Sequence, residues 1–120
     1  MHWTHIADRM AGDIVVLDVK GHMTLAEPES LLFAFVARLM RDEGRRKFVV
    51  NLRHLAFIDS VGIGEIVRSY THLASHGGML KLCDVGPRVR EVLEVTHLDS
   101  IIHMFDSEGD ALRSFPLTPH

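Results

Sequence analysis

The residues best placed to carry chemistry follow directly on an apolar run: Asp59, Ser60, Gly62 and Gly64. The run that ends at Ile58 predicts a strand and the residues after it predict a helix, so Ser60 is expected in the helix's first turn. Backbone N–H groups there have no partners within the helix, and the helix dipole is positive. Such a position can hold an anion, so the pattern indicates a serine that carries a phosphoryl group.

Phosphorylation of Ser60 would place a charge of about −1.5 to −2 beside Asp59. Two unit charges about 4 Å apart interact by about 1 kcal/mol in water and by about 4 kcal/mol at an effective dielectric constant near 20. Because each ~1.4 kcal/mol changes a binding constant tenfold, the charge could weaken binding to an acidic or apolar partner by tenfold or more. The helix dipole offsets part of the cost within the protein. We therefore expect the fold to survive the modification while an interface is lost.

The same residues also have a purely structural interpretation, because Asp and Ser are both preferred as helix N-caps. For the dipeptide alone, capping by Asp59 or Ser60 is the more frequent case. An Asp-Ser pair recurs at 99–100 and at 106–107 without a following Gly-x-Gly, and there we expect simple turn and cap residues. The glycines that follow Ser60 distinguish it from these other serines.

Gly62 and Gly64 have two interpretations as well. Each costs a helix roughly 1 kcal/mol relative to alanine, so their presence asks for a reason. One reason is the close approach of a partner or a phosphate, and another is tight packing of the helix on the sheet; the sequence does not choose between them. The pair is not a dinucleotide-binding fingerprint, because the third glycine is missing, nor a Walker loop, because no Gly-Lys-Ser/Thr follows.

Nine histidines raise the question of a metal site, and His72 and His76 are four residues apart on one expected helix. No acidic residue or cysteine completes a recognisable ligand set. The pair lies opposite the apolar stripe of that helix, so we expect surface histidines and no metal. A Gly-x-Ser-x-Gly hydrolase elbow is also absent, because Ile58 precedes Asp59. We therefore expect neither a cofactor nor an enzymatic activity.

The composition is ordinary: 120 residues, 47% hydrophobic and 24% charged, with a formal net charge of −3. These values indicate one soluble domain over residues 1–120, and direct nucleic-acid binding is not expected without an excess of positive charge. A single cysteine, Cys83, excludes an intramolecular disulfide. The longest apolar stretch, 31–37, is too short for a membrane span, and no secretory signal is visible. The sequence thus predicts a cytoplasmic protein.

Hydrophobic periodicity predicts the elements that position Ser60. An antiparallel pair of strands is expected around 4–9 and 14–19. Residues 27–42 have the spacing of a helix with one apolar face, with Pro28 suited to its first turn. The run 48–52 is apolar without alternation, as in a strand covered on both faces, and should be central.

Beyond Ser60 the pattern alternates between helix and strand. The expected elements are a helix with an apolar stripe from Ile63 to Leu73, a strand at 79–83, a helix from Pro87 to Thr96, a strand at 101–105, and a final helix that carries Phe115. This alternation favours parallel strands joined by right-handed crossovers. The predicted fold class is α/β, with a mixed, mostly parallel sheet of about five strands and about four helices.

This pattern resembles the STAS domain of bacterial anti-sigma factor antagonists over nearly the whole chain. The strongest likeness is the segment 57–64, which is similar to the family's Asp-Ser-x-Gly signature, whose serine is the phosphorylation site. Residues 77–78, 89–98 and 110–112 support the likeness. Two places depart from the family: Val61 is larger than the usual residue, and Gly21-His22-Met23-Thr24 replaces the more usual Gly-x-Leu-Asp.

The resemblance implies a STAS fold and a partner switch that regulates transcription, as in stress responses. Ser60 would be phosphorylated by an anti-sigma factor that is also a serine kinase of the histidine-kinase-like ATPase fold, and a separate Ser/Thr phosphatase would reset it. The unphosphorylated form would bind that kinase and free the sigma factor. The implied partner-binding residues are Asp59, Ser60, Val61, Gly62 and Gly64, together with His22 and Thr24 of a loop at 21–26.

A second hypothesis is a scaffold or an accessory subunit of a signalling or transport assembly, since STAS-like domains also occur there. Such a domain would bind an ATPase subunit or a nucleotide, and Ser60 need not be phosphorylated. The sequence leaves the oligomeric state open, including a homodimer.

Overall fold

The computed structural model describes residues 4–23 and 31–116, which form a five-stranded sheet and four α-helices. The strands are β1 (Thr4–Ala11), β2 (Ile14–Met23), β3 (Lys47–Ile58), β4 (Met79–Cys83) and β5 (Met104–Phe105), and they lie side by side in this order. The helices are α1 (Leu31–Glu43), α2 (Ser60–Ala74), α3 (Pro87–Val95) and α4 (Glu108–Arg113), with a short 3₁₀ turn at Leu98–Ser100. Only β1 runs antiparallel to its neighbour; the other strand pairs are parallel. The predicted fold class is confirmed.

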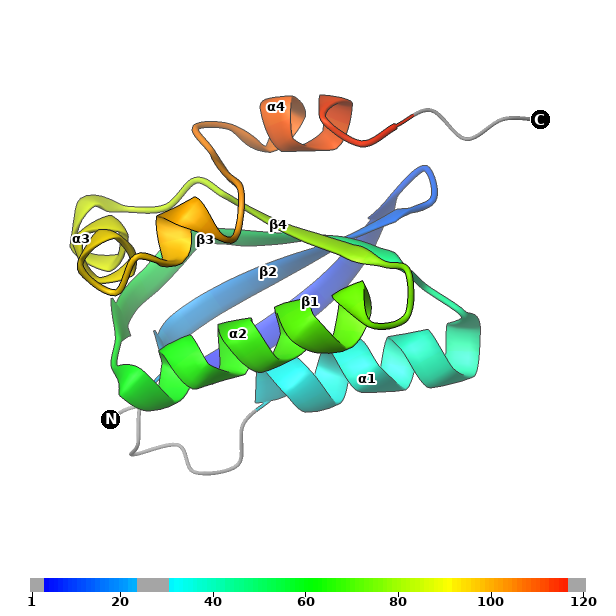
Figure 1. Ribbon diagram of the computed structural model, residues 1–120, viewed down its shortest axis with the longest axis horizontal. Helices are drawn as coiled ribbons and strands as arrows, with labels where there is room; N and C mark the ends of the chain where they lie inside the picture. Colours follow the sequence, from blue (N-terminus) through cyan, green and yellow to red (C-terminus); the bar gives the residue numbers. More distant parts are fainter. Residues whose placement is uncertain (1–3, 24–30, 117–120) are drawn as a thin grey trace.

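Helices cover both faces of the sheet unequally (Figure 1). The large core contains buried side chains of α1, α2 and α3 packed on one face, and a smaller cluster under α4 lies on the other. Because β2 and β3 are buried from both sides, Val16, Leu17, Val49 and Val50 are completely inaccessible to solvent. The apolar run 48–52 therefore belongs to the central strand, as predicted.

Three sequence expectations need correction. The expected strand at 101–105 reduces to β5, because the backbone turns at Leu98, whose carbonyl accepts N–H bonds from Ile101 and Ile102. That turn buries Ile102 in the large core and leaves Ile101 exposed. The final helix ends at Arg113, so Phe115, which packs in the smaller cluster, lies beyond it.

The third correction concerns the expected loop at 21–26. Gly21, His22 and Met23 belong to β2, because they pair in parallel with the last residues of β3. The predictions for Thr24 and Pro28, and for the helix start at 27, fall outside the described residues. None of the helices in 4–23 and 31–116 is long and apolar enough to cross a membrane.

A charged network fastens α4 to the sheet. Arg9 of β1 donates from Nε to Asp18 at 2.7 Å and from Nη1 to Glu108 at 2.8 Å. Asn51 of β3 donates to the same glutamate at 3.0 Å. These bonds, with that from Arg9 the stronger, stabilise the carboxylate and lower the pKa of Glu108 below its usual value of 4.5.

This lowered pKa predicts an acid-labile contact. Because the unfolded chain takes up the proton first, the stabilisation by ionised Glu108 is full above pH 4.5 and is lost as the pH falls through the folded-state pKa. Urea unfolding between about pH 3 and pH 7 should therefore show a smaller acid-induced loss of stability in Glu108→Gln than in the wild type. Glu91→Gln, at an exposed position of α3, is the matched control. Equal acid slopes in wild type and Glu108→Gln would contradict the prediction.

Candidate functional site

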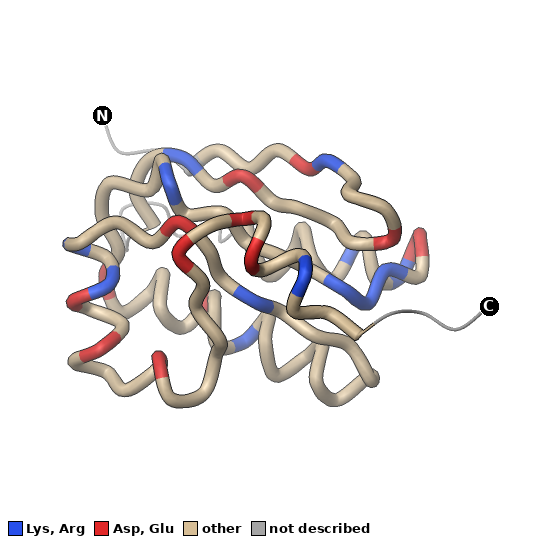
Figure 2. Tube along the Cα trace, turned by 90° about the horizontal axis from the view of Figure 1, so that it is seen from above, with Lys and Arg blue, Asp and Glu red and all other residues tan. Residues whose placement is uncertain are grey.

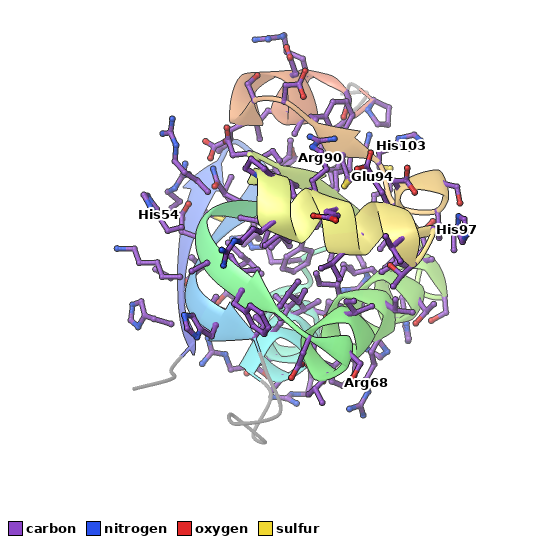
Figure 3. The ribbon with its side chains drawn as sticks, turned by 90° about the vertical axis from the view of Figure 1, so that its left-hand side faces the viewer. His54, Arg68, Arg90, Glu94, His97 and His103 are labelled. Carbon is purple, nitrogen blue, oxygen red and sulfur yellow. The ribbon has the colours of Figure 1, made fainter. Side chains whose placement is uncertain are left out.

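The candidate site lies at the edge of the sheet where β2 and β3 end and α2 begins, the edge that faces the viewer in Figure 3. The backbone N–H of Asp59 donates to the carbonyl of Met23 at 3.1 Å, which ties the end of β3 to the end of β2. The chain then turns directly into α2. Ser60 is thereby held at a fixed place beside the carboxyl ends of two parallel strands.

Asp59, not Ser60, is the N-cap of α2. Its backbone is extended, and its carboxylate accepts the N–H groups of Val61 at 2.9 Å and Gly62 at 3.3 Å. Ser60 is the first residue of the helix and is exposed. Its hydroxyl makes no hydrogen bond with any other described residue. Capping therefore explains Asp59 and leaves the Ser60 hydroxyl open to an incoming molecule.

The structure separates the two glycines. Gly62 is buried, and a Cβ there would lie 2.5 Å from the carbonyl oxygen of Met23 and 2.7 Å from Cγ1 of Ile58. A Cβ on Gly64 would meet nothing within 4 Å, and this residue is exposed. Gly62 thus permits α2 to pack on the strand ends. Packing does not explain Gly64, which leaves an exposed surface without a side chain one turn beyond Ser60.

One exposed face of α2 begins at Ser60. Positions 60, 64, 68 and 71 are exposed and recur at helical spacing, whereas Ile66, Ser69 and Leu73 are buried on the opposite face. The guanidinium of Arg68 lies 3.9 Å from the ring centroid of Phe33 on α1, and the label in Figure 3 places Arg68 on α2. Val61 is half-buried beside this face. Ser60 therefore lies at the end of a continuous helical surface.

The other predicted part of the partner surface consists of His22 and Thr24. Of these two residues only His22 is described, and it belongs to strand β2. His22 is half-buried on β2, and its ring centroid lies 6.1 Å from that of Phe57, its register partner on β3. Phe57 is 47% exposed, an unusual state for a large apolar side chain next to a polar site. Thr24 lies outside the described residues.

Comparison with known proteins identifies this arrangement. The sequence profile of the STAS domain matches residues 5–111. The chain belongs to the STAS domain family. The anti-sigma F factor antagonist of Paenibacillus polymyxa is 35% identical over 82 residues, which cover 64% of this chain and 70% of that protein.

Solved structures share this STAS fold. The crystal structure of an anti-sigma factor antagonist from Mycobacterium paratuberculosis has a TM-score of 0.81 at 20% identity and covers 93% of each chain. The phosphorylated form of the Bacillus cell-fate determinant SpoIIAA has a TM-score of 0.69 at 20% identity and covers 92% of this chain and all of that one. At these identities the structural likeness shows the fold alone. The relatives found by sequence show that the chain belongs with the anti-sigma factor antagonists.

Sequence reasoning missed an apolar groove beside Ser60 in this STAS domain. The groove has a volume of about 260 Å³ and lies between the end of β3 and α3; its lining residues are Phe57, Ile58, Arg88, Val89, Glu91 and Val92. Its two walls are about 30 residues apart in the sequence, so no local pattern could bring them together. The only local signal was a large aromatic residue, Phe57, directly before a buried strand end.

The two histidines do not share a helix as expected, because His72 lies in α2 whereas His76 lies in the turn beyond its end at Ala74. The Nδ1 atom of His76 lies 2.8 Å from the carbonyl oxygen of His72, and the ring of His72 meets Phe33 edge-on. Within residues 4–23 and 31–116, no three histidine, cysteine, aspartate or glutamate side chains are grouped so as to hold a metal ion.

Proposed function

We propose that this STAS domain, as an anti-sigma factor antagonist, binds an anti-sigma factor through the edge around Ser60 and is released when Ser60 is phosphorylated. The observation that carries the proposal is the Ser60 hydroxyl, which is exposed and makes no hydrogen bond with any other described residue, on a helix start capped by its neighbour. A kinase can reach this oxygen without disturbing the fold, because no hydrogen bond within residues 4–23 and 31–116 depends on it.

The neighbouring carboxylate makes the site sensitive to added charge. Asp59 already accepts two N–H groups at the start of α2, so it remains in place and its charge is fixed next to Ser60. A phosphoryl group would add about −1.5 to −2 there, and the combined charge would face any partner that covers the edge. The helix dipole offsets part of the electrostatic cost of this charge within the chain. It offsets none of the cost of placing the charge against an apolar or acidic partner surface.

The apolar surfaces beside Ser60 would supply the affinity. Phe57 and the groove at its side offer a pocket for a large apolar side chain of the partner, and Gly64 allows close backbone approach. Buried aromatic anchors of this kind contribute much of the binding energy in protein interfaces. We place Asp59, Val61 and His22 in the same surface, whereas Gly62 is buried and serves the packing of α2. Thr24, also predicted there, lies outside the described residues.

In this proposal the chain has no enzymatic activity and acts as a substrate and switch in the cytoplasm. The partner is an anti-sigma factor that is also a serine kinase of the histidine-kinase-like ATPase fold, and a Ser/Thr phosphatase restores the binding form. Residues 1–120 would act as one STAS unit. The scaffold or accessory-subunit hypothesis, with or without a nucleotide, has no feature of the described residues around Ser60 in its favour and serves as the competing outcome of the test.

The test is an affinity capture from lysate of the source cell with three baits: wild type, Ser60→Ala and Ser60→Asp. We expect wild type and Ser60→Ala to retain a kinase-like anti-sigma factor that Ser60→Asp loses, with retained proteins identified by mass spectrometry. A phosphopeptide that contains Ser60 should form when the retained kinase and ATP are supplied. Equal capture of transport or scaffold components by all three baits would overturn the switch and leave an assembly module.

A further inference from the structure

A second site lies on the sheet face that carries α4. This helix is only six residues long and covers part of the face. Next to it is a polar cleft of about 560 Å³, lined by side chains of β1, β2, β3, the loop after β4 and the start of α4. Its volume is in the range of small-molecule sites, although its lining is far more polar than is usual for them.

The carboxylates in this cleft already accept hydrogen bonds from other residues of the chain. Asp18 and Glu108 both bind Arg9, and Asp84 accepts the amide of Asn51 at 3.1 Å. Asn51 is only 9% exposed, and its other bonds go to Glu108 and to the backbone N–H of Arg53. These groups form a hydrogen-bonded network at one end of the cleft, and none of the three carboxylates pairs with Lys20, Arg53 or His54.

The other end of the cleft is basic. Strand register places His5, Lys20 and His54 in one row across β1, β2 and β3, and Arg53 is next to the row. The side chains of Lys20, Arg53 and His54 make no hydrogen bond or ion pair with any described residue. Lys20 and Arg53 therefore bring two formal positive charges to this end of the cleft without an ion-pair partner among the described residues.

A bound anion would neutralise these two positive charges, and the cleft has space for one. The next row on this face pairs Ala7 with Asp18, so between His5 and Arg9 the strand β1 contributes only a methyl group to the cleft. Figure 2 shows Lys and Arg positions near the end of the chain marked N and Asp and Glu positions gathered around α4. A cleft with one basic end focuses its positive potential on a small anion.

We propose that this cleft binds a small hydroxylated organic phosphate. The phosphoryl dianion lies between Lys20, Arg53 and His54, because two full positive charges match its charge and the guanidinium fork matches its oxygens. The hydroxyl groups of the ligand donate to the oxygens of Asp18 and Glu108, which keep lone pairs beyond those used by Arg9.

This inference goes beyond the proposed partner switch, because it uses different residues on another part of the molecule. None of the residues around Ser60 lines the cleft. In Figure 3, His54 points outward on the side of the molecule away from Arg68 on α2. Failure of one proposal therefore does not decide the other, and Ser60→Asp should bind the phosphate as the wild type does.

The test is an NMR titration of the ¹⁵N-labelled chain with inorganic phosphate, ribose 5-phosphate and ribose at constant ionic strength. We expect saturable amide shifts at Lys20, Arg53 and His54 with both phosphates and added shifts at Asp18 with ribose 5-phosphate. The variant Lys20→Gln/Arg53→Gln should raise the dissociation constant at least about tenfold, because each lost charge-assisted bond is worth about this factor. Arg41→Gln, an exposed arginine of α1, should not change it.

Each of the other outcomes overturns the proposal or part of it. Shifts that grow linearly, that chloride reproduces, or that persist unchanged in Lys20→Gln/Arg53→Gln would overturn it, provided that melting curves show the variant to be folded. If inorganic phosphate bound saturably and ribose 5-phosphate bound no more tightly, the proposed contacts with the hydroxyl groups of an organic ligand would be refuted. Shifts caused by an acidic peptide and not by phosphate would make the cleft a protein contact instead.

Discussion

Gly62→Ala should lower the free energy of unfolding by about 3 kcal/mol or abolish folding, whereas Gly64→Ala should not destabilise the protein. The added methyl group at 62 would lie 2.5 Å from a backbone oxygen of Met23, which cannot rotate away as a side chain could. Overpacking a well-filled site costs typically 1–3 kcal/mol, and a contact with backbone belongs at the upper end of this range. Urea and thermal unfolding of the purified variants measure the difference.

Gly64 is the matched control because it lies in the same helix, two residues further on. Its substitution meets open space and removes the backbone entropy of glycine, so Gly64→Ala should gain up to about 1 kcal/mol of stability. If both variants lost the same stability, the packing role of Gly62 would be refuted. A stabilised Gly64→Ala that binds the partner less well would show instead that this glycine is kept for the interface.

The fold could be predicted from the sequence where burial imposes a pattern over several residues. The continuous run 48–52 indicated the central strand, and the apolar stripes indicated α1 and α2, because an element buried on one or both faces must show this in its spacing. The strand at 101–105 failed because Ile101 and Ile102 look alike in sequence, although one is 55% exposed and the other buried. A tertiary turn at Leu98 decides between them.

The site could be predicted only as far as its local chemistry. The Asp-Ser pair showed that a cap was present, but geometry was needed to assign it to Asp59 and to leave Ser60 without a bond. The two glycines look equivalent in sequence, since the neighbours that exclude a Cβ at 62 come partly from β2, nearly 40 residues earlier. The groove beside Phe57 and the basic row at Lys20 depend on strand and helix neighbours, which no window of sequence contains.

The two proposed surfaces share the pair of strands β2 and β3. β2 and β3 carry the basic row at Lys20 and His54, and a few residues later the same strands end at Met23 and Ile58 beside Ser60. The register between them shifts twice, after Asp18 and after Gly21. Such irregularities re-aim side chains at strand ends, and here they allow His22 and Phe57 to meet at the edge next to Ser60.

Ser60→Asp should weaken binding to the anti-sigma factor by tenfold or more while the melting temperature stays within a few degrees of the wild type. The new carboxylate lies in the first turn of α2, where the helix dipole favours it by about 0.3–1 kcal/mol, and it replaces a hydroxyl that makes no hydrogen bond with the described part of the chain. At the interface the same charge adds to that of Asp59 and must be desolvated under the partner. Isothermal titration calorimetry with the purified partner gives the affinity, and Ser60→Ala should bind as the wild type does.

The matched control is Ser100→Asp, because it adds the same charge after another aspartate in an exposed turn. It tests whether net charge alone weakens binding, and we expect it to leave the affinity unchanged at physiological salt, where the Debye length is about 8 Å. Equal affinities of wild type and Ser60→Asp for the anti-sigma factor would refute the proposed switch. Equal losses in Ser60→Asp and Ser100→Asp would show long-range repulsion rather than a contact at Ser60, and a lost melting transition in Ser60→Asp would show that the hydroxyl supports the fold.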